Sequence, residues 1–163
     1  MSEYRVEQKE SFRLVGFKTM LTGSTEIHSP AFTGQKTAFF KTVIQDGQMA
    51  LLRPLAESPY GYGAIAVEGN TVSYYAGVVT NRQAEEGLGA DELLFPGGDY
   101  LVLEGAGGLS RLAFDKLEDQ AFGEMLRESD EWAYAGGPVA EVLLNGNPTD
   151  AQVEVWVPVR KRG

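Results

Sequence analysis

The alternation of apolar and polar residues along the 163-residue chain predicts the same order of elements twice. In the first half, residues 7–21 predict an extended strand with Gly16 as a bulge. Residues 35–47 place apolar side chains at helical spacing, and residues 49–57 predict a second, shorter helix. Residues 61–80 contain two apolar runs that meet at a Glu-Gly-Asn turn, which indicates a β-hairpin.

The order recurs after an acidic segment near residues 81–91, which has no apolar periodicity. Residues 98–105 predict a strand, residues 107–126 an amphipathic helix, and residues 138–159 another hairpin. The pattern therefore predicts an α+β fold built from a duplicated β-α-β-β unit.

We expect residues 1–163 to form one domain with two pseudo-symmetric halves, about 1–80 and 92–163, joined by the acidic linker near 81–91. Hairpins and short connections favour antiparallel pairing. The expected architecture is a curved antiparallel sheet with the helices on one side and a central cleft between the halves. Ligands prefer such junctions.

Side-chain alternation separates the last predicted strand into two faces. Val153, Val155 and Val157 share one face and predict the core, so Trp156 points to the opposite face. Tyr75 occupies the matching place in the first hairpin. Glu141 lies in the strand paired with that of Trp156, but a one-residue slip in register would reverse its face, so sequence leaves its direction open.

A carboxylate beside Trp156 would have a use, since each well-placed ring attracts a lipophilic cation by roughly 0.5 to 2 kcal/mol. This hypothesis makes Glu141 the anchor of a hydrophobic, aromatic or cationic small molecule. The alternative is that Glu141 is a half-exposed strand residue bonded to Ser, Tyr or backbone groups.

Composition narrows the remaining functions. The formal net charge of −9 would repel a phosphate backbone, so we expect no direct nucleic-acid binding. No apolar run is long enough for a bilayer and no export signal begins the chain, which predicts a cytoplasmic protein without membrane contact. Cysteine is absent and His28 is the lone histidine, so we expect no metal site. The glycine turns at 105–108 and 97–98 match no nucleotide fingerprint, and no cofactor is expected.

Several stretches, in their order along the chain, resemble the GyrI-like, AraC-type effector-binding domain. They are FRLVGFKT, VSYYAGVV, GGDYLVLEGAGG, and VAEVLLNG followed by VEVWVPV. The resemblance implies a cleft for hydrophobic, often cationic, small molecules, with Glu141 and Trp156 inside it. Further ligand-binding candidates are Tyr75, by internal symmetry, Trp132 and Tyr134 at the rim, and Phe17 and Tyr100 on the opening strands.

The resemblance also implies alternatives. Some relatives hydrolyse reactive cyclopropane-bearing toxins, for which Glu141 would be the catalytic general base, with Glu104 or Glu154 as a second acid. Others are implicated in gyrase protection, so a gyrase-interacting protein is a third possibility. Many relatives carry an N-terminal helix-turn-helix or coiled coil, whereas this sequence opens directly on the domain, which favours a stand-alone ligand binder.

Overall fold

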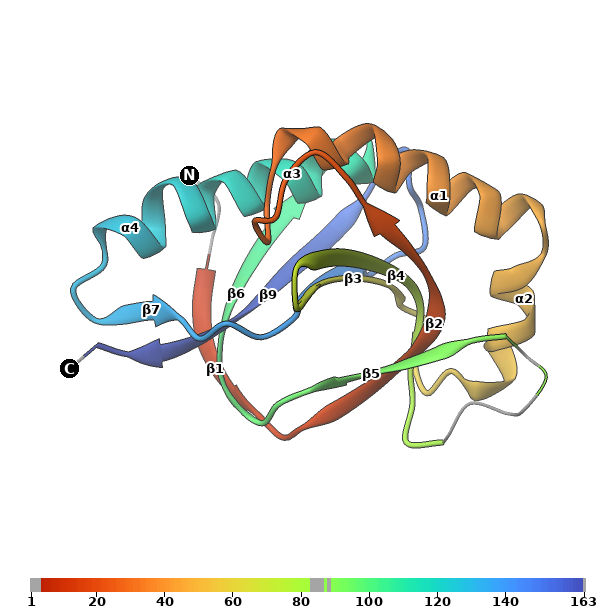
Figure 1. Ribbon diagram of the computed structural model, residues 1–163, viewed down its shortest axis with the longest axis horizontal. Coiled ribbons are helices and arrows are strands. Elements are labelled where there is room, and N and C mark those ends of the chain that lie inside the picture. The colour runs from red at the N-terminus through yellow and green to blue at the C-terminus, as the bar shows by residue number, and fades with distance from the viewer. Residues whose placement is uncertain (1–3, 83–86, 88, 163) are drawn as a thin grey trace.

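A nine-stranded antiparallel sheet organises the chain in the computed structural model, which describes residues 4–82, 87 and 89–162. The strands are β1 (Tyr4–Lys9), β2 (Phe12–Leu21), β3 (Gly61–Glu68), β4 (Thr71–Val79), β5 (Asp91–Phe95), β6 (Gly98–Ala106), β7 (Trp132–Tyr134), β8 (Val139–Leu143) and β9 (Gln152–Lys161). Figure 1 shows the sheet curving beneath the helices. The expected curved antiparallel sheet is confirmed.

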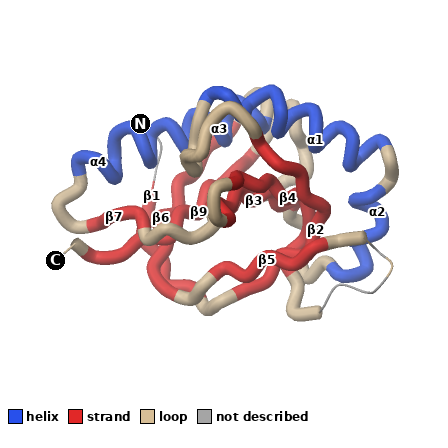
Figure 2. The backbone as a smooth tube through the Cα atoms, in the orientation of Figure 1, coloured by secondary structure: helices blue, strands red, loops and turns tan. Residues whose placement is uncertain are grey.

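The helices lie together on one side of the sheet, as the tube in Figure 2 shows. They are α1 (Thr33–Gln45), α2 (Gln48–Leu52), α3 (Ser110–Gln120), which continues through a π-helical turn (Ala121–Met125), and α4 (Leu126–Glu128), with 3-10 turns at Pro30–Phe32 and Arg53–Leu55. Ser29 caps the turn that leads into α1, because its hydroxyl accepts a hydrogen bond from the Ala31 amide. Gly47, with φ 72°, ends α1 in the left-handed conformation.

The strand order is β1-β6-β9-β8-β3-β4-β2-β5, with β7 added to β9. Read outward from the central pair β8–β3, hairpin partners come first (β9 and β4), then β6 and β2, then the edge strands β1 and β5. Each edge strand precedes one of these strands in sequence but pairs with the other: β1 with β6 and β5 with β2. The order is therefore symmetric about β8–β3, while the proposed boundaries of the halves stay a prediction.

Two local expectations are wrong. Residues 7–21 form two strands separated by Glu10 and Ser11, and Gly16 is not a bulge, because the β2–β4 register is unbroken through its pairing with Gly77. A Cβ atom on Gly16 would lie 2.5 Å from the Ala76 carbonyl oxygen, so the glycine permits close strand approach. In addition, β5 begins at Asp91, inside the expected linker, whose residues 83–86 and 88 lie outside the described residues.

The sheet buries apolar side chains on both faces. The helix-facing side packs against α1 and α3 through two groups of buried residues, of which Val153, Val155 and Val157 form part. On the opposite face, the Phe12 ring of β2 lies 6.1 Å from Tyr100 of β6 and 5.7 Å from Trp156 of β9, measured between ring centroids. Strands near opposite edges of the sheet are thus brought together, so this face closes over its own core. In the described residues, no helix is long and apolar enough to cross a bilayer.

Candidate functional site

The register of β8 decides the direction of Glu141. Glu141 pairs with Val155 of β9 and with Gly63 of β3, whereas Trp156 pairs with Ala140. Residues paired directly across neighbouring strands share a face, and consecutive residues alternate. Glu141 therefore points toward the helices with the valines, on the face opposite Trp156.

Both carboxylate oxygens of Glu141 are bound by cationic side chains from the two covering helices. Lys36 of α1 donates to Oε2 at 3.0 Å. Arg111 of α3 donates from Nη1 to Oε1 at 2.8 Å and from Nη2 to Oε2 at 2.7 Å, which is a bidentate pair. Lys36 and Glu141 are each 1% exposed. The charge in the middle of the strand is thus paired and hydrogen-bonded, as a buried charge must be.

The fourth hydrogen bond to Glu141 comes from Tyr74 of β4, whose hydroxyl donates to Oε1 at 2.9 Å. Gly63, on β3 between β4 and β8, makes this approach possible: a Cβ atom there would lie 2.4 Å from the Tyr74 hydroxyl oxygen. A glycine in the strand therefore positions a hydrogen-bond donor.

Two further acids of α3 complete what we call the charge cluster, defined as Lys36, Tyr74, Arg111, Asp115, Glu118 and Glu141. Asp115 Oδ1 accepts from Arg111 Nη2 at 2.8 Å, and its Oδ2 accepts from the Thr33 hydroxyl at 2.8 Å. Glu118 is fully buried, with Oε2 at 3.3 Å from Arg111 Nη2 and Oε1 at 3.7 Å from Lys36 Nζ. Its Oε1 has no hydrogen-bond partner among the described residues.

The cluster drives the two buried glutamates to opposite protonation states. Burial and then the negative charge of Glu141 raise the pKa of Glu118 well above its ordinary value, so its neutral form is favoured. Burial opposes ionisation of Glu141 as well, but Arg111 and Lys36 outweigh it and hold the pKa of Glu141 well below its ordinary value. Burial, reinforced by Glu141, also keeps Tyr74 a neutral donor by raising its pKa.

A cavity of about 440 Å³, the Glu141 pocket, opens above this cluster between α1 and α3. It is lined by Thr33, Lys36, Thr37, Phe40, Lys41, Ile44, Gly61, Tyr62, Gly63, Tyr74, Leu109, Ser110, Arg111, Leu112, Phe114, Glu141, Leu143, Pro148 and Thr149. Because β3 and β8 form its floor, the pocket lies at the centre of the symmetric strand order.

Three of the lining residues are large apolar side chains that water reaches. Ile44 is 52% exposed, Leu109 53% and Leu112 61%. Single exposed apolar residues are common, but a group at the rim of one cavity is typical of a ligand-binding site. The pocket therefore combines an apolar rim with a polar, charged floor, an arrangement that can hold an organic molecule of small size.

The aromatic residues predicted to surround Glu141 lie on the other face of the sheet. Tyr75, Ala64, Ala140 and Trp156 form one row across β4, β3, β8 and β9, so the expected correspondence of Tyr75 with Trp156 fits the register. Tyr100 belongs to the same group of buried side chains. None of the three rings is brought beside Glu141, and Lys9 lies over the Trp156 ring at 4.0 Å.

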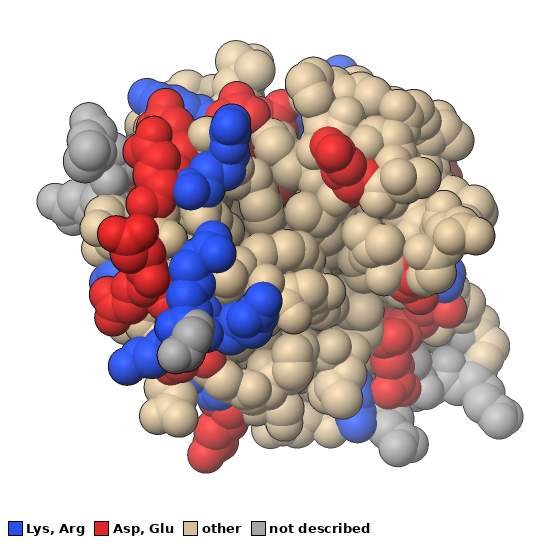
Figure 3. All heavy atoms as spheres, turned by 60° about the vertical axis from the view of Figure 1, so that its left-hand side comes forward, with Lys and Arg blue, Asp and Glu red and all other residues tan. Residues whose placement is uncertain are grey.

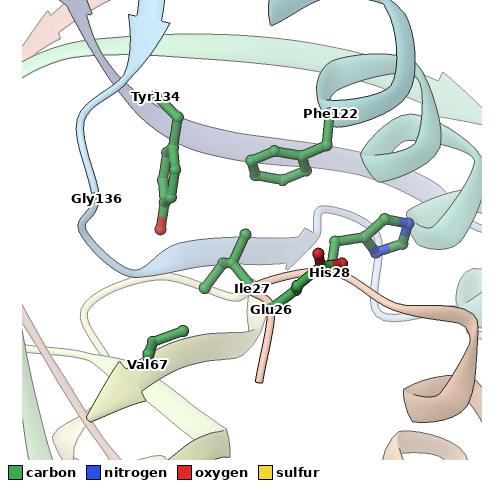
Figure 4. Close-up of a pocket in the computed structure, with 7 residues that line it drawn as sticks. All are labelled: Glu26, Ile27, His28, Val67, Phe122, Tyr134 and Gly136. Carbon is green, nitrogen blue, oxygen red and sulfur yellow. The ribbon is translucent and has the colours of Figure 1, made fainter. Parts of the chain in front are cut away.

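The other predicted ligand-binding residues are also separate from Glu141. Phe17 is buried with Val43 and Leu52 beneath α1 and α2. Tyr134 lines a second cavity of about 500 Å³, in which it stands across from Phe122, with His28 near the helix (Figure 4). Trp132 lines a third cavity of about 550 Å³ beside α4.

The two acids considered as catalytic partners of Glu141 lie elsewhere. Glu104 and Glu154 pair across β6 and β9, and both form ion pairs with Arg5 of β1, at 3.0 and 3.3 Å. On the side of the molecule that Figure 3 turns forward, acidic and basic side chains lie next to one another. The acid that accompanies Glu141 is Glu118, from a helix.

Lys36, Arg111 and Glu118 were not predicted as site residues, although the sequence carried a signal for Lys36 and Glu118. Lys36 lies in the apolar stripe of α1 formed by Phe32, Phe39 and Val43, and Glu118 lies in that of α3 between Phe114 and Ala121. A charged residue in the buried stripe of an amphipathic helix predicts a buried partner.

Comparison with known proteins identifies a matching family and several solved structures with the same fold. The family described as "Cass2: Integron-associated effector binding protein" matches residues 5–159. No curated protein matches the chain. Among solved structures, SAV2435 bound to tetraphenylphosphonium is 21% identical, with a TM-score of 0.78 over 97% of this chain and 94% of that one.

Two further structures share the fold. The integron cassette protein Cass2 of Vibrio cholerae is 13% identical, with a TM-score of 0.62 and coverage of 96% of this chain and 95% of that one. The EcmrR C-terminal domain is 11% identical, with a TM-score of 0.61 and coverage of 99% of both chains. The effector-binding fold expected from the sequence is confirmed.

Proposed function

Since the chain belongs to the Cass2 family of integron-associated effector-binding proteins, we propose that it binds a hydrophobic, aromatic small molecule in the Glu141 pocket. The observation that carries this proposal is the combination of an apolar, partly exposed rim with a floor of convergent polar groups. Sites for organic ligands have this composition, and a cavity of about 440 Å³ is in their usual range.

The ligand-bound neighbour supports the same kind of molecule. SAV2435 has the same fold and carries tetraphenylphosphonium, a bulky ion with an aromatic surface. Phe40, Phe114 and Leu143 provide an apolar lining that such a surface can contact. We therefore propose that the ligand of this chain is also aromatic.

The charge cluster favours binding over hydrolysis. A general base must have a lone pair free to take a proton. Glu141 accepts four hydrogen bonds, from Lys36, Tyr74 and two nitrogens of Arg111, which is about the full capacity of a carboxylate. Its lowered pKa also makes it a weak base. We therefore assign Glu141 a structural role at the pocket floor, and the hydrolase and gyrase-interacting alternatives stay predictions.

The proposed partner and cellular location are those expected from the sequence. The net charge of −9 opposes a direct contact with nucleic acid, so the proposed partner is the small molecule alone. The cytoplasmic location likewise stays a prediction.

The proposal can be tested with the neutral dye N-phenylnaphthylamine, whose fluorescence rises in apolar surroundings. We expect saturable binding to the wild-type protein. Leu112→Ser removes an exposed rim side chain and should weaken binding about threefold to fivefold through lost apolar contact. Leu51→Ser is the matched control, because Leu51 is a 54% exposed helical leucine outside the pocket lining.

Equal weakening by the two leucine variants would show that the dye binds exposed apolar surface in general. Absence of saturable binding by the dye and by charged aromatic probes would contradict the proposed function itself.

A further inference from the structure

Arg111 and Lys36 already occupy the carboxylate that a cationic ligand would use. Among the described residues, Glu141 is the only acidic side chain that lines the pocket. Arg111 and Lys36 donate hydrogen bonds to both of its carboxylate oxygens. A ligand cation could reach Glu141 only by displacing one of these groups. Displacement would leave a buried cation with less compensation, which is strongly unfavourable.

The charge balance of the cluster points in the same direction. Two positive side chains, Lys36 and Arg111, face two negative ones, Glu141 and Asp115. Glu118 adds no charge while it is protonated, the state favoured by its burial beside Glu141. The floor of the pocket is therefore electrically balanced before any ligand arrives.

Lys41 adds an unbalanced positive charge at the exposed side of the pocket. It lies on α1, lines the pocket and is exposed, and it forms no ion pair within the described part of the chain. Since the floor is balanced, Lys41 gives the described part of the pocket one net positive charge.

We propose that Arg111, Lys36 and Lys41 determine the charge specificity of the Glu141 pocket, and that its ligand is an aromatic anion. The aromatic part contacts the apolar lining, and the anionic group lies toward Lys41 at the mouth. Arg111 and Lys36 act inside the protein as the counter-ions that a cationic ligand would otherwise supply. This inference rests on the proposed function and adds the chemical class of the ligand.

Tetraphenylborate and tetraphenylphosphonium form a matched pair of probes, because they have nearly the same shape and opposite charges. Their affinities can be compared by isothermal titration calorimetry in sodium buffers. We expect the wild-type protein to bind tetraphenylborate at least about tenfold more tightly than tetraphenylphosphonium, a difference of about 1.4 kcal/mol. The protein's net charge of −9 favours the cation at long range, so a preference for the anion would have to arise in the pocket.

Variants then distinguish the contribution of the pocket charges to this preference from intrinsic differences in binding between the two ions. Lys41→Gln should reduce the preference for the anion by no more than about threefold, as expected for one solvent-exposed charge. Lys116→Gln, an exposed lysine of α3 outside the pocket lining, should leave it unchanged. Arg111→Gln should reverse the preference, because it leaves Glu141 with one cationic partner fewer.

Because Arg111→Gln removes a buried charge, its fold is checked by circular dichroism, and the Lys41→Gln comparison decides if that variant does not fold. Equal or tighter binding of tetraphenylphosphonium by the wild type would overturn the anion proposal and leave the proposed function standing. Failure of both ions and of the neutral dye to bind would overturn both.

Discussion

On the helix-facing side of the sheet, Glu141 is buried with two cationic partners and a tyrosine hydroxyl, whereas the opposite side buries rings whose polar atoms reach its edges. There, the Trp156 indole donates to Glu154 at 2.8 Å and the Tyr100 hydroxyl to the Pro96 carbonyl at 2.7 Å. One side satisfies polar groups in its interior, and the other places them at its boundary.

The contrast explains why the helix-facing side has an open cavity and the other side forms a closed core. Aromatic rings pack edge to face, as Trp156 does with Phe12 and Tyr62 at 5.7 and 5.9 Å, and leave little space. Charged groups need partners at hydrogen-bonding distance, and here Lys36 and Arg111 reach Glu141 from two separate helices, α1 and α3. The space between those helices remains open above them as the Glu141 pocket.

The largest effect should come from removing the buried carboxylate. Glu141→Gln leaves Lys36 and Arg111 without their main counter-charge, and we expect the free energy of unfolding to fall by about 3 kcal/mol. Urea unfolding followed by tryptophan fluorescence measures this change. The double variant Glu141→Gln, Lys36→Met should lose less free energy of unfolding than the two single variants lose together. In the double variant the remaining cation, Arg111, is still paired with Asp115.

A loss below about 1 kcal/mol for Glu141→Gln would be that of a solvent-exposed ion pair. It would contradict the contrast between the two sides of the sheet.

A smaller effect is expected from the aromatic side. Trp156→Leu removes ring contacts from a partly buried position and should lower the free energy of unfolding by about 2 kcal/mol. Its affinity for N-phenylnaphthylamine should stay within about twofold of the wild type, because Trp156 lies on the face opposite the Glu141 pocket. The two measurements use the same protein samples, with Leu112→Ser as the variant of opposite behaviour.

A tenfold loss of affinity in Trp156→Leu, without a matching loss of stability, would instead return Trp156 to the ligand site. That result would restore the cleft expected from the sequence.

Local patterns in the sequence predicted the two hairpins, the main helices and the direction of Trp156, but not β5 or β7. Valine alternation in residues 153–157 was enough to turn Trp156 away from the helix-facing core, and the hairpin at Gly69 followed from its turn residues. The direction of Glu141 was not predictable, because the loop before β9 left the register open by one residue. A one-residue difference in register decides whether Glu141 lies in the observed charge cluster or in the expected aromatic cleft.

Contacts between distant segments explain the rest of what the sequence did not reveal. Lys36, Arg111 and Glu141 are separated by 75 and 30 positions along the chain, and their meeting depends on how both helices cross the sheet. Gly16 was interpreted as a bulge because its partner was unknown, and pairing with Gly77 gave it another role. Helical stripes could have identified Lys36 and Glu118 as buried charges, but not their partners.

The smallest effect should distinguish the two glutamates within the charge cluster. The pKa of Glu118 is raised in the folded protein by burial and by Glu141, so the folded state keeps a proton that the unfolded chain loses. Stability therefore falls as pH rises from the ordinary pKa toward the raised one. Between about pH 5 and about pH 6 this loss is at most about 1.4 kcal/mol. Glu118→Gln removes it, so the variant should gain about 1 kcal/mol on the wild type over that interval in urea unfolding. Glu141, with its pKa lowered, stays ionised in the folded state of both proteins, so its contribution cancels from the difference between them. A constant difference between Glu118→Gln and the wild type would mean that Glu118 is ionised in the folded protein, and the cluster would then carry a negative charge.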